Sequence, residues 1–174
     1  MADFNEAIGP ILEHEGGYVD HPADPGGATN LGITFKLFKQ YAPELGVPST
    51  KEALKALTIT QAEHIYKKEF WDKMQGDKIK DQQLATQVFD FYVNAGSNAI
   101  KLLQTELGVQ ADGAFGPTTL AILNYANPEI VFDQFRDGRV EYYKNLVVKK
   151  PALNVFLKGW LNRANKFVYK KPKI

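Results

Sequence analysis

The sequence predicts a mainly α-helical fold with one small loop or hairpin near its N-terminus. Apolar residues recur at helical spacing through most of the chain, and capping residues and prolines separate these segments. No segment shows a strong alternating strand pattern, and the one place for a hairpin is the polar, glycine-rich stretch 18–33. The rest of the chain is expected to act as a helical scaffold around this stretch.

The composition limits the classes of protein to consider. A chain of 174 residues suffices for one well-cored domain or two small, intimate ones. The chain has no cysteine, which excludes disulfides and thiol chemistry, and its net charge of +1 gives no global argument for nucleic-acid binding. No stretch reaches a membrane-spanning length, and the N-terminus lacks the features of a signal peptide.

The first predicted helix delivers a carboxylate. Glu15 extends a row of apolar residues, and Gly16 and Gly17 then end the helix. A carboxylate at the C-terminal end of a helix dipole, partly out of water, favours its protonated form, as a general acid requires. The alternative is that Glu15 is an exposed residue at a helix end. The apolar row comprises Phe4, Ile8, Ile11 and Leu12.

A second carboxylate, Asp24, follows in a loop that Pro22 and Pro25 stiffen. Two carboxylates that face each other across a cleft suit an inverting glycosidase, in which one protonates the leaving oxygen and the other activates water. Thr29 is a candidate to hold that water. Asp24 can equally form an Asx-turn beside Pro-Gly, and spacing alone leaves both interpretations open.

The motif Glu15-Gly-Gly-Tyr18, followed by Pro22-Ala-Asp-Pro-Gly-Gly-x-Thr-Asn-x-Gly-Ile-Thr34, resembles the signature of glycoside hydrolase family 108. These enzymes are N-acetylmuramidases of phages and bacteria. The resemblance implies a lysozyme-like helical fold with Glu15 as the catalytic glutamate. A looser likeness to phage-type lysozymes implies a catalytic trio of Glu15, Asp24 and Thr29, with Tyr18 shaping a sugar subsite. Asp20 departs from the usual family pattern and is a second candidate for the base.

The middle of the chain is expected to form helices over 34–41, from Ser49 or Thr50 to Leu57, and over 83–95, with a capping box over 60–63 that starts another. Phe70 is predicted to be core, whereas Trp71 suits either the core or a sugar cleft. The segment Asp90-Phe-Tyr-Val-Asn94-Ala-Gly96 also resembles the family. Asn94 either contacts substrate, orients the loop, or caps the helix C-terminus.

The second half changes character after residue 97. The segment Asp112-Gly-Ala-Phe-Gly-Pro-Thr-Thr119 resembles the turn of small peptidoglycan-binding helical modules, in which Phe115 fills the core. Pro128 opens a long helix and Pro151 ends it. We therefore expect a catalytic region over 1–96 and a helical peptidoglycan-binding-like region over 97–174 packed against it.

These expectations converge on an N-acetylmuramidase that hydrolyses the β-1,4 bond between N-acetylmuramic acid and N-acetylglucosamine. Two carboxylates suffice for this reaction, so no cofactor is expected, and the three histidines show no ligand spacing for a metal. The alternatives are a lytic transglycosylase, a non-catalytic wall-binding module, or nucleic-acid binding by the basic C-terminal helices, which carry no recognition motif.

The expected setting follows from this activity. We expect a monomeric phage endolysin, made in the host cytoplasm without a signal peptide and released through a holin-type pore. Its partner is then peptidoglycan, its contact with the cell wall is peripheral, and it has no nucleic-acid partner.

Overall fold

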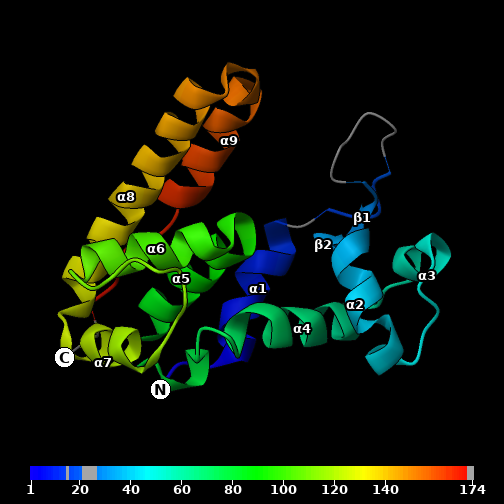
Figure 1. Cartoon of the computed structure of the whole chain (residues 1–174), viewed down its shortest axis with the longest axis horizontal. Coiled ribbons are helices and arrows are strands. Elements are labelled where there is room, and N and C mark those ends of the chain that lie inside the picture. Colours follow the sequence, from blue (N-terminus) through cyan, green and yellow to red (C-terminus); the bar gives the residue numbers. More distant parts are fainter. Residues whose placement is uncertain (15, 21–26, 172–174) are drawn as a thin grey trace. The chain divides into compact units, whose positions relative to one another are not determined.

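The computed structural model describes residues 1–14, 16–20 and 27–171 (Figure 1). The chain divides into two compact units: an N-terminal unit, Phe4–Asp72, and a C-terminal unit, which combines Met1–Asp3 with Lys73–Ile174. Over the described ranges the secondary structure is helical apart from one two-stranded sheet and a single bridge, which confirms the predicted fold class. None of the helices in these ranges is long and apolar enough to cross a membrane.

The N-terminal unit is built around the buried side of its first helix. Ile8 and Ile11 are almost completely buried, as their helical spacing predicts, and Phe4 meets Trp71 edge to face at 5.9 Å between ring centroids. The elements in chain order are α1 (Phe4–His14), β1 (Thr29–Asn30), β2 (Ile33–Thr34), α2 (Phe35–Leu45), α3 (Lys51–Lys55), α4 (Ile59–Tyr66) and the π-helical turn η1 (Lys67–Trp71).

Two helix boundaries differ from the prediction. Helix α2 starts after its Thr34 cap as expected but continues through Pro43, because the fully buried Phe38 and Ala42 hold its last turns in the core despite the hydrogen bond that proline removes. Helix α4 is capped by Thr58, whose side chain forms a capping box with Gln61. The predicted box at 60–63 is wrong because two capping patterns overlap in this segment, two residues apart.

The aromatic pair after α4 also corrects the prediction. Trp71 is fully buried, whereas Phe70, which was expected to be core, is only half-buried. The reason is the π-helical turn η1: its wider turn rotates the following side chains away from the positions that an α-helical count gives them. Trp71 is therefore a core residue and not part of a sugar cleft.

The C-terminal unit is helical throughout the part that the structure describes. Helices α8 and α9 run side by side as an antiparallel hairpin, and α5 and α6 pack on α8 (Figure 1). Pro117 and Pro128 open α7 and α8, and Pro151 follows the end of α8, all as predicted. The elements are η2 (Gly76–Lys78), α5 (Gln82–Ala95), α6 (Ser97–Glu106), α7 (Pro117–Tyr125), α8 (Pro128–Lys149), η3 (Pro151–Leu153) and α9 (Asn154–Asn165).

The Asp-Gly turn before α7 is organised by a buried glutamine. The Gln104 amide nitrogen lies 2.8 Å from the Asp112 carboxylate and 3.2 Å from the Thr119 hydroxyl, and its oxygen accepts from the Gly113 N–H at 2.8 Å. The pKa of Asp112 lies below its usual value, mainly because the carboxylate accepts from the Ala114 N–H and secondly because it accepts from the Gln104 amide. The motif is thus a fold signature, although Phe115 is half-buried and not the core plug that was expected.

Three helices of this unit meet at a buried ion cluster. Asp90 on α5 is 1% exposed and accepts from the Arg163 guanidinium of α9 at 2.7 Å. Arg139 on α8 is fully buried, and its Nη1 lies 2.7 Å from the other oxygen of Asp90. That Arg139 contact lacks good hydrogen-bond geometry, so it acts as an ion pair, supplemented by the ring of Phe91 at 4.8 Å.

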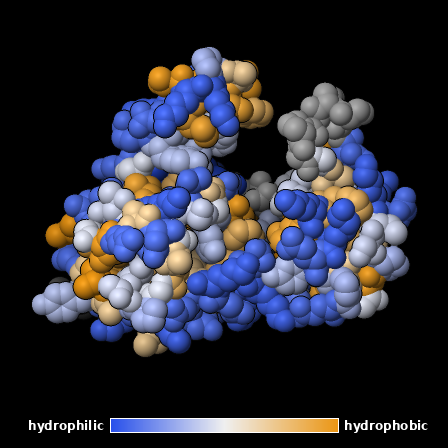
Figure 2. Space-filling model, in the orientation of Figure 1, coloured by the Kyte–Doolittle hydropathy of each residue, from blue (hydrophilic) through white to orange (hydrophobic). Residues whose placement is uncertain are grey.

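Exposed apolar side chains gather where α8 ends and α9 begins (Figure 2). Val148 and Val155 are 78% and 79% exposed, and Phe156 is 53% exposed. Two exposed lysines, Lys149 and Lys150, lie between them. This end of the hairpin therefore contributes little to the core of the C-terminal unit.

Gln87 on α5 gives a first testable prediction. Its side chain is fully buried, and neither polar atom has a hydrogen-bond partner among residues 1–14, 16–20 and 27–171. We expect Gln87→Met to raise the free energy of unfolding by about 1–2 kcal/mol, because methionine fills similar space without an unpaired amide. Urea unfolding checks this. Gln104→Met is the matched control and is expected to lower stability, because that amide is fully used; a loss of stability in Gln87→Met would contradict the prediction.

Candidate active site

The polar stretch near the N-terminus is closed at its base by backbone pairing. The Val19 N–H donates to the Thr29 carbonyl at 2.9 Å, and the Thr29 N–H donates back to Val19 at 2.8 Å. Strand β1 then pairs with β2, so that Thr29 faces Thr34 across the ladder. The ends of the 19–29 segment are thus held together, which confirms the small hairpin that was predicted within 18–33.

A tight turn links the two strands and ties them to the end of α1. Leu31 and Gly32 have φ of 49° and 75°, and positive φ at both central positions is typical of a type I′ turn. The Leu31 N–H donates to the Gly16 carbonyl at 3.1 Å, and its own carbonyl accepts from the Tyr66 hydroxyl at 2.8 Å. These two bonds hold a leucine in a conformation that L-residues adopt at a cost.

Asn30 anchors the hairpin to α3. Its side chain is 6% exposed, and its amide donates to the carbonyls of Leu54 and Lys55 at 2.9 and 3.1 Å. Those carbonyls belong to the last turn of α3, where Leu54 also accepts from the Leu57 N–H at 3.1 Å and the Asn30 amide is an additional donor to both. Asn30 lies inside the family motif, yet the sequence reasoning gave it no role. A polar residue at a position that faces the core was the signal for it.

The surface around Tyr18 carries both signs of charge. The Tyr18 hydroxyl lies 3.4 Å from the Asp20 carboxylate, which also pairs with the Lys51 ammonium at 3.0 Å. Burial, followed by the charge of Asp20, raises the pKa of Tyr18, and the bond to Asp20 raises the pKa of Lys51. Lys55 lies 5.7 Å from the centre of the Tyr18 ring. Asp20, the second candidate for the base, is thus engaged by a cation.

The structure brings two of the five predicted site residues together. Tyr18 directly precedes Val19, the bridge partner of Thr29, so both lie at the base of the same hairpin. Glu15 and Asp24 lie outside the described residues, but Gly16 on one side and Thr29 on the other are anchored as above. Asn94 belongs to the C-terminal unit; it is exposed, and its amide donates to the Asp90 carbonyl at 2.7 Å. Gly96, not Asn94, occupies the C-cap of α5.

The comparisons with known proteins decide the family. Residues 8–96 match the family Glycosyl hydrolase 108. The chain belongs to this family. Residues 98–165 match a second family, Predicted Peptidoglycan domain. The solved structure titled "Structure of Brucella abortus SagA" is 33% identical over 96% of each chain, with a TM-score of 0.75. The comparison with curated proteins found no match.

This family membership makes the protein a glycoside hydrolase, and the second match adds a peptidoglycan-binding domain, which implies peptidoglycan as the polymer that is hydrolysed. The compact units divide the chain at Asp72, inside the first family match, so the predicted boundary at 96 stays a prediction. In the ranges that the structure describes, no group of three or more His, Asp or Glu side chains is arranged to hold a metal ion.

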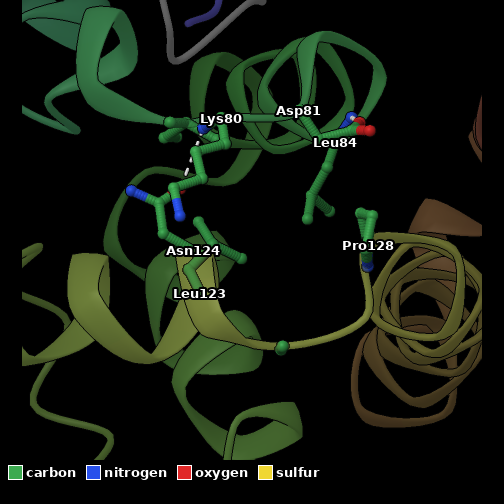
Figure 3. A pocket seen from close by; sticks show the side chains of 8 residues that line it. Lys80, Asp81, Leu84, Leu123, Asn124 and Pro128 are labelled. Carbon is green, nitrogen blue, oxygen red and sulfur yellow. Dashed lines mark hydrogen bonds between the residues drawn. The ribbon is translucent and has the colours of Figure 1, made fainter.

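The C-terminal unit of this glycosyl hydrolase 108 protein contains a pocket of about 200 Å³ (Figure 3). Lys80, Asp81 and Leu84 line it from the start of α5, opposite Leu123 and Asn124 of α7. Its polar side chains serve the fold. Asn124 bonds the backbone on both sides of Ile79, and Asp81 caps α5. Asp81 also accepts from Tyr169, whose pKa burial and this bond raise to about 12. Asn124 and Asp81 therefore stabilise the contact between these segments, and we assign no ligand to the pocket.

The anchor at Asn30 yields a second prediction. Asn30→Ala removes the side-chain donor from the Leu54 and Lys55 carbonyls, although Leu54 keeps its bond from the Leu57 N–H, and we expect a loss of about 1–2 kcal/mol in the free energy of unfolding. We also expect peptidoglycan hydrolysis to be slower even at temperatures at which the variant is still folded, because Asn30 is adjacent to Thr29, a predicted catalytic residue. Asn145→Ala, at an exposed position of α8, is the control. Equal behaviour of the two variants in thermal unfolding and turnover would contradict the anchoring role.

Proposed function

We propose that this protein is an N-acetylmuramidase that hydrolyses the β-1,4 bond between N-acetylmuramic acid and N-acetylglucosamine. The observation that carries the proposal is the motif from Glu15 to Thr34, which stands within the glycosyl hydrolase 108 match and spans a hairpin closed by the Val19–Thr29 pairing. A lysozyme-type reaction needs two carboxylates at a suitable separation. Among the described residues of this motif, Gly16 is hydrogen-bonded to Leu31 and Val19 to Thr29, which supports the proposal.

In the proposed reaction Glu15 donates its proton to the glycosidic oxygen as the bond to the anomeric carbon breaks. Asp24 orients a water molecule and accepts its proton while the water oxygen bonds to that carbon, and Thr29 helps to hold the water. Tyr18 contributes its ring to the adjacent sugar subsite, and Asn94 is a further candidate for substrate contact. One bond breaks, one water is consumed and no redox partner is needed.

The test is the identity of the product ends. Purified peptidoglycan is digested with the full chain, reduced with borohydride and analysed by mass spectrometry. We expect reduced N-acetylmuramic acid at the new ends. Reduced N-acetylglucosamine would show that the enzyme cuts the other glycosidic bond of the glycan strand. Ends that borohydride leaves unreduced, and that are one water lighter than the unreduced hydrolysis product, would be 1,6-anhydro ends and would make the enzyme a lytic transglycosylase. No new ends, with retention on the wall intact, would make it a binding module.

We further propose that the protein acts as a monomeric phage endolysin that reaches the wall through a holin-type pore. The combination of a catalytic and a peptidoglycan-binding match in one short chain supports this. Expression in Gram-negative cells with and without a pore-forming holin tests it. Lysis only in the presence of the holin is the expected result, and lysis in both cultures would point to another export route.

A further inference from the structure

One face of α9 forms an open groove of about 470 Å³. The residues that line it are three or four positions apart, so they lie on one side of the helix. The opposite side packs on α8, where Trp160 stacks on Tyr143 at 4.9 Å between ring centroids and Ala164 is fully buried. The groove therefore faces away from the helical hairpin. Its lining consists of Asn154, Leu157, Lys158, Leu161, Asn162 and Asn165.

The asparagines of this groove are uncommitted. The side chains of Asn154, Asn162 and Asn165 form no hydrogen bond within the described part of the chain, and none of them caps α9. Five other asparagines, Asn30, Asn94, Asn98, Asn124 and Asn127, each bond to the backbone, whereas the exposed Asn145 of α8 forms no side-chain hydrogen bond within the described residues. The groove thus concentrates free amide groups on one helix face.

The three asparagines of the groove stabilise neither the helix nor its packing. Asparagine is a weaker helix former than alanine, lysine or glutamine, so an exposed interior position such as Asn162 gains nothing structural from it. Leu157 and Leu161 are half-buried between the amides, and Lys158 supplies one cation. No acidic residue follows Glu141 in the sequence, so nothing on α9 opposes an anionic group.

We propose that the α9 groove binds the glycan strand of peptidoglycan through its N-acetyl groups. A side-chain amide carries one acceptor and a donor group, which complement the N–H and the carbonyl of an N-acetyl group. The two leucines offer an apolar strip for acetyl methyl groups and sugar C–H faces, and Lys158 meets a carboxylate of the lactyl group or stem peptide. The choice of peptidoglycan as ligand rests on the proposed function, whereas the groove itself rests on the uncommitted amides.

The distribution of groups favours hydrogen-bond recognition over simple attraction of an anionic polymer. Three amides accompany a single lysine in the groove, and α9 spans about 16 Å at 1.5 Å per residue between Asn154 and Asn165. A site of this kind loses little affinity as salt is raised, because neutral hydrogen bonds are not screened. It also depends on acetylation of the sugar.

The experiment measures binding without turnover. The full chain that carries Glu15→Gln is mixed with insoluble purified peptidoglycan, and the bound fraction is measured by sedimentation at low and high salt. We expect Asn162→Ala with Asn165→Ala to weaken binding roughly tenfold, at about a factor of three for each lost hydrogen bond. Alanine favours the helix, so these variants should stay folded. Asn145→Ala on α8 is the matched control and should bind like the parent.

A second readout identifies the chemical group. Soluble N-acetylglucosamine oligomers should compete with the wall for the parent protein, and their de-N-acetylated forms should not. Unchanged binding by the double variant, equal loss in Asn145→Ala, or loss of the parent's binding on raising the salt would each overturn the proposal. The binding assay needs no catalysis, so the two proposals can fail separately. If binding depends on the groove but the digestion products are not those of a muramidase, the proposed activity is wrong and the proposed binding site is retained.

Discussion

Glu15→Gln is expected to reduce the rate of peptidoglycan hydrolysis by about 10²–10⁴-fold, the usual contribution of a positioned general acid. Glutamine keeps the shape of the side chain and its hydrogen-bonding capacity but has no proton to give to the leaving oxygen. The backbone anchor at Gly16 and the buried row of α1 do not depend on the charge of Glu15, so the fold should be retained. Turbidity loss of permeabilised Gram-negative cells measures the rate.

Glu13→Gln is the matched control for this experiment. Glu13 is exposed on α1, two positions before Glu15, and its substitution removes the same carboxylate chemistry from a neighbouring place. We expect this variant to clear cells like the wild type. Equal clearing by Glu15→Gln and the wild type would show that Glu15 is not the general acid. A large loss of clearing rate in Glu13→Gln would assign that role to Glu13.

The helical fold was predictable because its signals are local. The row through Ile8 and Ile11, the Thr34 cap and the prolines that open α7 and α8 each act within one or two turns. The capping box was misplaced because two local patterns overlap, and two other errors fall where the chain departs from a local rule. Buried Phe38 and Ala42 carry α2 through a proline, and the π-helical turn changes which aromatic residue enters the core.

The candidate site was predictable from its motif only in part. The motif located Thr29 and Tyr18, and backbone pairing places them at one hairpin base. It gave no role to Asn30, because the α3 carbonyls that this side chain serves are about 25 residues away in sequence. The same limit hid the ion cluster, since Asp90 and Arg163 are separated by 73 residues and each looks like an ordinary surface charge. Polar groups that pair over long distances in the chain produce no periodic pattern in the sequence, so they cannot be predicted from it.

That ion cluster carries the largest expected effect on stability. Asp90→Asn removes the carboxylate between two guanidinium groups, and Arg139, which is fully buried, then has no counter-charge. We expect a loss of about 3–5 kcal/mol in the free energy of unfolding, because an unpaired charge in the interior is far costlier than a broken surface pair. Urea unfolding followed by circular dichroism measures it.

Asp133→Asn is the matched control, since Asp133 pairs with Arg136 at 2.8 Å on the same helix but is 48% exposed. Its loss is expected to stay below about 1 kcal/mol. The double variant Asp90→Asn with Arg139→Met separates the two physical terms. If the cost of Asp90→Asn is mainly the stranded charge of Arg139, removing that charge restores part of the stability, because Arg163 is 16% exposed and can reach water. A double variant as unstable as the sum of its single variants would instead show that the carboxylate itself holds α5, α8 and α9 together.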